Sequence, residues 1–103
     1  MSKQIFENAQ LSMPTANTEY SYDLPENVER FSFQLRDPSV VLRVSAKAGK
    51  VATSANPYFT VPADAEWTED NLFEPKTQTF YFATASATQT LEIRLWTGIR
   101  RAS

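Results

Sequence analysis

Hydrophobic side chains recur at every second position along several segments of this 103-residue chain. In residues 28–36 the apolar side chains are Phe31, Phe33 and Leu35, and polar side chains stand between them. Residues 39–46 and 91–96 show the same alternation. Successive side chains of a β-strand point to opposite faces, so this spacing predicts antiparallel strands with one buried face and one solvent-facing side. It disfavours helices, whose apolar residues recur at three- and four-residue spacing.

Turn-forming residues separate these runs. Asp37-Pro38 divides the first two, and a small polar segment, 84–89, divides residues 79–83 from 91–96. We therefore predict β-hairpins over residues 28–46 and 77–97.

Weaker strand patterns at residues 19–24, at 58–61 and near Trp67 complete the series. The sequence thus predicts an all-β domain over residues 18–97, an antiparallel β-sandwich or jelly roll of about six to eight short strands. The expected core residues are the inward members of the alternating runs, namely Phe31, Phe33, Leu35, Val40, Leu42, Val44, Phe80, Phe82, Leu91, Ile93 and Leu95.

The first 17 residues differ from the rest of the chain. They contain Ile5, Phe6, Leu11 and Met13 without a clear period, and Pro14 opens a linker-like stretch. Ordering each backbone residue costs about 1–2 kcal/mol, so we expect residues 1–17 to form an extended arm that orders on a neighbouring subunit. The alternative is a frayed terminus. Residues 98–103 are expected to be a solvated C-terminal tail.

One further residue joins the expected interface. Trp96 falls on the polar side of its alternating run, and tryptophan is enriched where proteins meet. The predicted protein-interface residues are Ile5, Phe6, Leu11, Met13 and Trp96.

The composition excludes several kinds of chemistry. The chain has no His and no Cys, which excludes Ser-His-Asp triads, thiolate nucleophiles and zinc or haem sites with those ligands. The net charge of −2 argues against a nucleic-acid partner. No apolar run approaches the ~20 residues that span a membrane, and the N-terminus lacks the features of a signal peptide. We expect a non-enzymatic protein without a cofactor or a membrane, made in a cytoplasm.

Carboxylates crowd one segment, formed by Asp64, Glu66, Glu69, Asp70 and Glu74. Calcium takes six to eight oxygen ligands, but the spacing here is not that of a known calcium loop. A solvated acidic loop, or a contact for a basic partner, is the preferred interpretation, and no metal is expected. Paired carboxylates also serve glycoside hydrolysis, for which so short a chain leaves little room.

Sugar binding is the main alternative to a role in protein contacts. Carbohydrate sites use exposed aromatic rings, and Trp67 or Trp96 would have to lie open in a shallow groove. A small carbohydrate-binding β-sandwich module therefore stays an open hypothesis.

Five segments carry a family resemblance. They are Tyr20-Ser21-Tyr22-Asp23-Leu24-Pro25, Arg30-Phe31-Ser32-Phe33-Gln34-Leu35-Arg36, Tyr58-Phe59-Thr60-Val61-Pro62 with Trp67 after it, Phe80-Tyr81-Phe82-Ala83, and Leu91-Glu92-Ile93-Arg94-Leu95-Trp96. In pattern and order, over residues 18–97, they resemble the small all-β virion proteins of tailed bacteriophages. The chain departs from that pattern in its low glycine content, with only two glycines.

The resemblance implies a structural role and no catalytic residues. It implies a capsid decoration (cement) protein or an accessory protein of the neck or tail, made in the host cytoplasm and located in the virion. The implied partners are other virion proteins and copies of the chain itself, as a homo-oligomer within a symmetric assembly.

Overall fold

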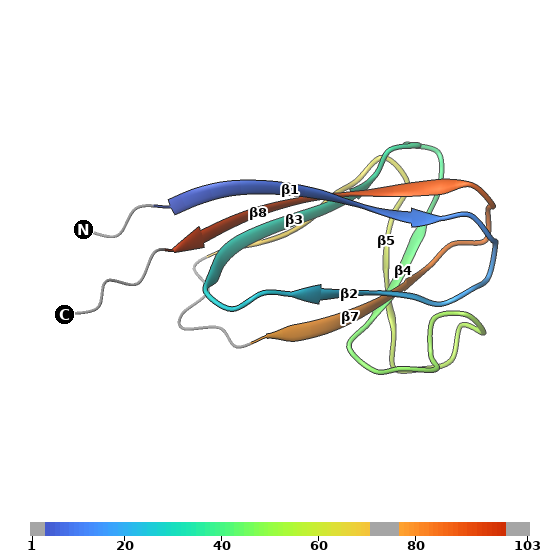
Figure 1. Ribbon diagram of the computed structural model, residues 1–103. Helices are drawn as coiled ribbons and strands as arrows, with labels where there is room; N and C mark the ends of the chain where they lie inside the picture. Colours follow the sequence, from blue (N-terminus) through green and yellow to red (C-terminus); the bar gives the residue numbers. More distant parts are fainter. Residues whose placement is uncertain (1–3, 71–76, 99–103) are drawn as a thin grey trace.

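Two antiparallel four-stranded sheets pack face to face in the computed structural model, which describes residues 4–70 and 77–98 (Figure 1). Sheet A contains, in spatial order, β1 (Gln4–Met13), β8 (Gln89–Gly98), β3 (Val28–Leu35) and β6 (Trp67–Glu69). Sheet B contains β2 (Tyr20–Leu24), β7 (Gln78–Ala83), β4 (Leu42–Ser45) and β5 (Phe59–Val61). The described residues include no helix. The predicted all-β sandwich of up to eight short strands is confirmed.

The pairing follows a simple rule. β1 pairs with β8, β2 with β7, β3 with β6 and β4 with β5, all antiparallel. The first four strands therefore pair with the last four in reverse order, and the four pairs are divided between two layers. That arrangement is the jelly roll.

Both predicted hairpins are wrong. β3 lies in sheet A and β4 in sheet B, so residues 36–41 cross between the sheets instead of turning back within one. β7 and β8 likewise lie in different sheets. The alternation shows which side of a strand is buried. Because both sheets bury their inner sides in the same core, it does not show to which sheet the strand belongs. The pattern alone therefore cannot distinguish a hairpin from a crossing.

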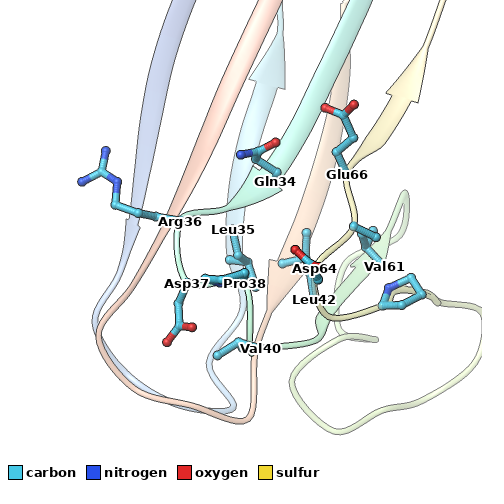
Figure 2. A pocket seen from close by; sticks show the side chains of 12 residues that line it. Gln34, Leu35, Arg36, Asp37, Pro38, Val40, Leu42, Val61, Asp64 and Glu66 are labelled. Atoms are coloured by element: carbon cyan, nitrogen blue, oxygen red, sulfur yellow. The ribbon is translucent and has the colours of Figure 1, made fainter.

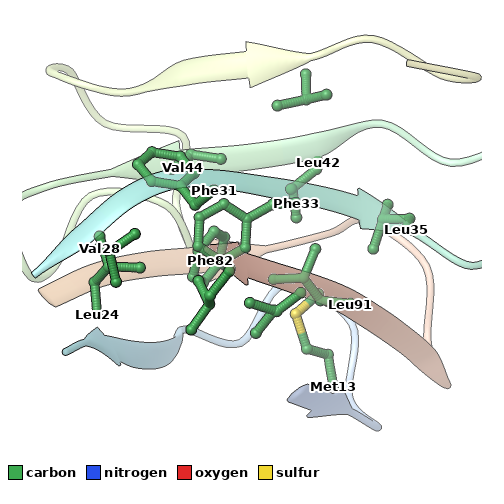
Figure 3. Close-up of a cluster of buried hydrophobic side chains, with 13 residues drawn as sticks. Met13, Leu24, Val28, Phe31, Phe33, Leu35, Leu42, Val44, Phe82 and Leu91 are labelled. Carbon is green, nitrogen blue, oxygen red and sulfur yellow. The ribbon is translucent and has the colours of Figure 1, made fainter. Parts of the chain in front are cut away.

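The core lies between the sheets and follows the predicted parity (Figure 3). Of the expected core residues, nine are buried, and Val40 and Phe80 pack against them partly buried. Phe33 is completely buried, and its ring contacts Phe31 and Phe82 at centroid distances of 5.0 and 5.3 Å. Further core residues come from strand ends and loops, namely Met13, Leu24, Val28, Val51, Val61 and Ala83.

The expected N-terminal arm is instead the edge strand of sheet A. Residues 4–13 pair with residues 89–98 of β8 without a register shift. Ala9, Leu11 and Met13 lie on the inward side of β1 and pack on the core. The apolar alternation is interrupted by Glu7 on this side and by Phe6 on the other. Those two residues hide the period-two signal, so the sandwich begins before residue 18. Of the expected tail 98–103, Gly98 ends β8 and the rest lies outside the described residues.

Candidate functional site

Exposed hydrophobic side chains gather where β1 begins and β8 ends. Phe6 is 53% exposed and its neighbour Ile5 is 46% exposed. Phe6 lies opposite Trp96 in the ladder, with their ring centroids 5.2 Å apart. Ile5, Phe6 and Trp96 are called the β1 patch below; Phe6 and Trp96 lie on the outer face of sheet A, and Ile5 projects from the other side of the strand end. The patch lies at the end of the sandwich where β1 begins and β8 ends (Figure 1).

The predicted interface residues divide into two groups. Ile5, Phe6 and Trp96 are at least partly accessible, as an interface requires. Met13 is 1% exposed and belongs to the core, and Leu11 packs against that core partly buried. Leu11 and Met13 therefore stabilise this chain's own sandwich, because the inward side of β1 lies over the core at this end of the strand; Ile5 has the same parity but lies at the exposed end.

An arginine covers the ring of Trp96. Arg30 of β3 pairs with Trp96 in the register, and its guanidinium carbon lies 4.7 Å from the ring centroid. This cation–π contact places the guanidinium group over one face of the indole ring. Since Arg30 and Phe6 both contact the ring, Trp96 does not present the open aromatic face that stacks on a sugar.

A polar network adjoins the β1 patch on the outer face of sheet A. The Ser32 hydroxyl donates to Glu66 Oε2 at 2.7 Å and accepts bonds from Arg94 and Thr68. Arg94 also forms an ion pair with Glu66. Ser32 has outward parity yet is 2% exposed, because these side chains cover it. The Ser32 hydroxyl is thus engaged both as a donor and as an acceptor within this network.

A shallow groove of about 260 Å³ runs between the patch and this network. Phe6, Asn8 and Gln10 of β1 form one wall, and Gln34, Glu92 and Arg94 form the other. Glu92 forms an ion pair with Arg36, whose Nε lies 3.0 Å from the Oε2 atom of Glu92. The groove offers amide groups from β1 and fixed charges from β8, which suits polar contacts with another protein.

The backbone of β1 has a free hydrogen-bonding edge. Gly98 N–H donates to the Asn27 carbonyl, and Arg36 N–H donates to the Thr90 carbonyl, so even-numbered residues of β8 direct their backbone groups toward β3. In an antiparallel ladder this direction alternates along the strand. The odd-numbered residues of β8 and their odd-numbered partners in β1 therefore face each other. The N–H and C=O groups of Phe6, Asn8, Gln10 and Ser12 consequently point away from the sheet, where no described strand pairs with β1.

Glu7 lies on the inward side of β1, over sheet B. Burial raises the pKa of Tyr22 on β2 above its ordinary value, and the nearby Glu7 carboxylate raises it further. The side chain of Glu7 therefore acts on the opposite sheet, and does not add charge to the groove.

Trp67 packs within a cluster of aromatic side chains. Its ring lies 4.9–5.3 Å, centroid to centroid, from the rings of Phe31, Phe33, Phe59 and Phe80. Its indole N–H donates to Glu69 at 2.9 Å. The residue closes the β6 side of the sandwich, so it is not an open platform for a sugar.

The acidic segment does not converge on one point. Glu66 binds Arg94, and Glu69 accepts the bond from Trp67; Glu74 lies outside the described residues. Across residues 4–70 and 77–98, no three acidic side chains come together as a metal site would need.

A cavity of about 310 Å³ opens where β3 crosses to sheet B (Figure 2). Leu35, Val40, Leu42 and Val61 supply its apolar lining, and charged residues stand around it. Among these, Asp37 is held by the hydroxyl and N–H of Ser39, which lower the pKa of its carboxyl. Two of the three carboxylates in its lining are engaged elsewhere, Asp37 by Ser39 and Glu66 by Ser32 and Arg94.

Comparisons with known proteins add no identity. No family model, no curated protein and no solved structure matches the chain. Among the described residues there is no helix long and apolar enough to cross a membrane.

Proposed function

We propose that the protein is a non-enzymatic structural subunit that works through protein–protein contacts in the particle of a tailed bacteriophage, as a capsid decoration protein or a neck or tail accessory. The observation that carries the proposal is the β1 patch at the end of the longest edge strand, where the exposed Phe6 contacts Trp96 and the exposed Ile5 precedes Phe6 on the other side of the strand.

The energetics favour a contact surface at this place. Complete burial of a large aliphatic or aromatic side chain contributes about 1.5–3 kcal/mol, and Ile5 and Phe6 are about half exposed in the isolated chain. Trp and Arg are enriched among residues that dominate binding energy, and Trp96 with Arg30 brings both to the patch.

The phage component rests on the sequence resemblance over residues 18–97. The jelly roll agrees with it, since viral capsid subunits use this fold, but lectins use it as well. The sugar-binding alternative receives less support, because Trp96 is covered by Arg30 and Phe6 and Trp67 is packed among four rings.

The test compares two matched aliphatic positions in the phage that encodes the chain. Ile5→Asp removes apolar surface from the patch, and Val41→Asp makes the same kind of change at an equally exposed position, 45% against 46%, outside it. We expect Ile5→Asp to reduce incorporation into purified particles at least tenfold, while Val41→Asp incorporates as wild type does. Particle-bound protein is measured by quantitative mass spectrometry, and thermal melts confirm that both variants fold. Absence of the wild-type chain from purified particles, or equal incorporation of both variants, would contradict the proposal.

A further inference from the structure

The free edge of β1 is unusually unprotected. Its ten residues contain no Lys, Arg, Pro or Gly, and its ladder with β8 has no bulge. Proteins normally block exposed strand edges with such residues, with bulges or by shortening the strand. Here the side chains of Phe6, Asn8, Gln10 and Ser12 are all exposed beside the outward backbone groups.

We propose that this edge pairs with the β1 edge of a second copy of the chain, antiparallel and about a two-fold axis at Ala9. The two copies of sheet A then form one continuous eight-stranded sheet. The inference deepens the proposed function by naming the partner of the β1 side, and it rests on that proposal in treating this side as a contact surface. A two-fold contact is self-complementary, and cyclic dimers are the commonest oligomers.

The directions of the backbone groups restrict the registers. Only even-numbered residues of β1 present hydrogen-bonding groups to the edge, so even residues must face even residues of the partner. Among the symmetric registers that satisfy this condition, those centred on Glu7, Asn8, Ala9 or Gln10 keep more than half of β1 paired.

Charge then selects among these registers. A centre at Glu7 places two carboxylates opposite each other, which destabilises a strand pair. A centre at Asn8 aligns Arg94 with the partner's Arg94, since Asn8 stands beside Arg94 in the ladder. A centre at Gln10 aligns Glu92 with the partner's Glu92 in the same way.

The register centred on Ala9 avoids all three conflicts. It places Gln10 opposite the partner's Asn8, so the two rows through these pairs each have Glu92 at one side and the other copy's Arg94 at the other. Ala9 then faces the partner's Ala9 in a non-hydrogen-bonded pair, where Cα atoms approach to about 4.5 Å.

A proline scan tests the edge directly. Asn8→Pro removes an N–H that points outward and leaves the β1–β8 bonds intact, so the variant should fold, as proline does at solvent-facing edge positions. Asn8→Ala is the matched control, because it removes the same side chain and keeps the N–H. In sedimentation equilibrium we expect wild type and Asn8→Ala at twice the 11.7 kDa chain mass, and at least a tenfold higher dissociation constant for Asn8→Pro.

A cysteine variant tests the register, and the chain's lack of Cys makes the result unambiguous. Mild oxidation of Ala9→Cys should yield a disulfide-linked dimer, because the facing Cα atoms lie within disulfide range. Val41→Cys, exposed but distant in the fold, should stay uncrosslinked at the same concentration.

The outcomes separate this inference from the proposed function. A monomeric wild type, or a folded Asn8→Pro that dimerises as tightly as wild type, overturns the edge pairing. If such a chain still enters particles through Ile5, the proposed function stands. If the dimer forms as described but the chain is absent from particles, the edge pairing stands and the phage role fails.

Discussion

The two edges of sheet A are built in opposite ways. β6 is three residues long, and its Trp67 is packed among four aromatic rings while Glu66 and Glu69 hold hydrogen bonds on either side. β1 is ten residues long, regular, and exposed along its outer side. A short, packed edge offers a partner almost no backbone to pair with, whereas a long, regular one offers five alternate residues. The difference indicates that sheet A ends at β6, whereas a further strand can pair with it at β1.

Deleting residues 2–12 should have the largest effect on this contrast. The deletion removes nearly all of the β1–β8 ladder and uncovers β8, whose Leu91 and Ile93 lie in the core. A domain of this size is stable by only about 5–15 kcal/mol, so we expect circular dichroism to show no cooperative thermal transition. Deletion of residues 2–3 alone, which precede β1, is the control. An unchanged melting temperature for the longer deletion would restore the interpretation of an independent arm.

Trp67→Ala should have the next largest effect, at the closed edge. Truncation of a packed aromatic residue costs about 3–5 kcal/mol, and each kcal/mol lowers the melting temperature of a small domain by about 4–8 °C. We therefore expect a fall of at least about 12 °C by differential scanning calorimetry. Trp67→Phe keeps a ring among the four neighbours and should lose less than half as much. If the two variants melt alike, the aromatic cluster does not seal this edge.

The smallest expected effects on stability come from single truncations in β1, which distinguish its buried end from its exposed end. Met13→Ala removes a core side chain (Figure 3) and should cost about 2–5 kcal/mol in urea unfolding. Phe6→Ala removes an exposed ring and should change the free energy of unfolding by no more than about 0.5 kcal/mol. Equal costs would show that the patch stabilises the monomer, and that it is not held available for a partner.

Strand parity was the part of the fold that could be predicted from the sequence. Phe31, Phe33 and Leu35 all face inward, because alternation is a local property that any two-layer sandwich preserves. The partner of each strand could not be predicted in this way. β1 lies beside β8, more than 70 residues further along the chain, and no local pattern encodes a pairing over that distance.

The candidate site was predicted in part for the same reason. Trp96 has outward parity, and the structure places it at the surface beside Phe6. The predicted interface role of Leu11 and Met13 depends on the prediction of an arm over residues 1–17. The alternation from Ala9 to Met13 instead indicates that both side chains face inward. The covering of Trp96 by Arg30 depends on the neighbouring strand β3, which the sequence of β8 does not specify.

The pairing of the first strand with the last also determines when the fold can close during synthesis. β1 is synthesised before every other strand of the sandwich, but its partner is complete only when residue 98 has been added. At about 5–20 residues per second, the strand waits roughly 5–20 s without its ladder. During that time both of its edges are open, and Glu7 is the one charged residue within it. The nascent chain is therefore most exposed to premature association through the same ten residues that, once folded, leave a single edge free.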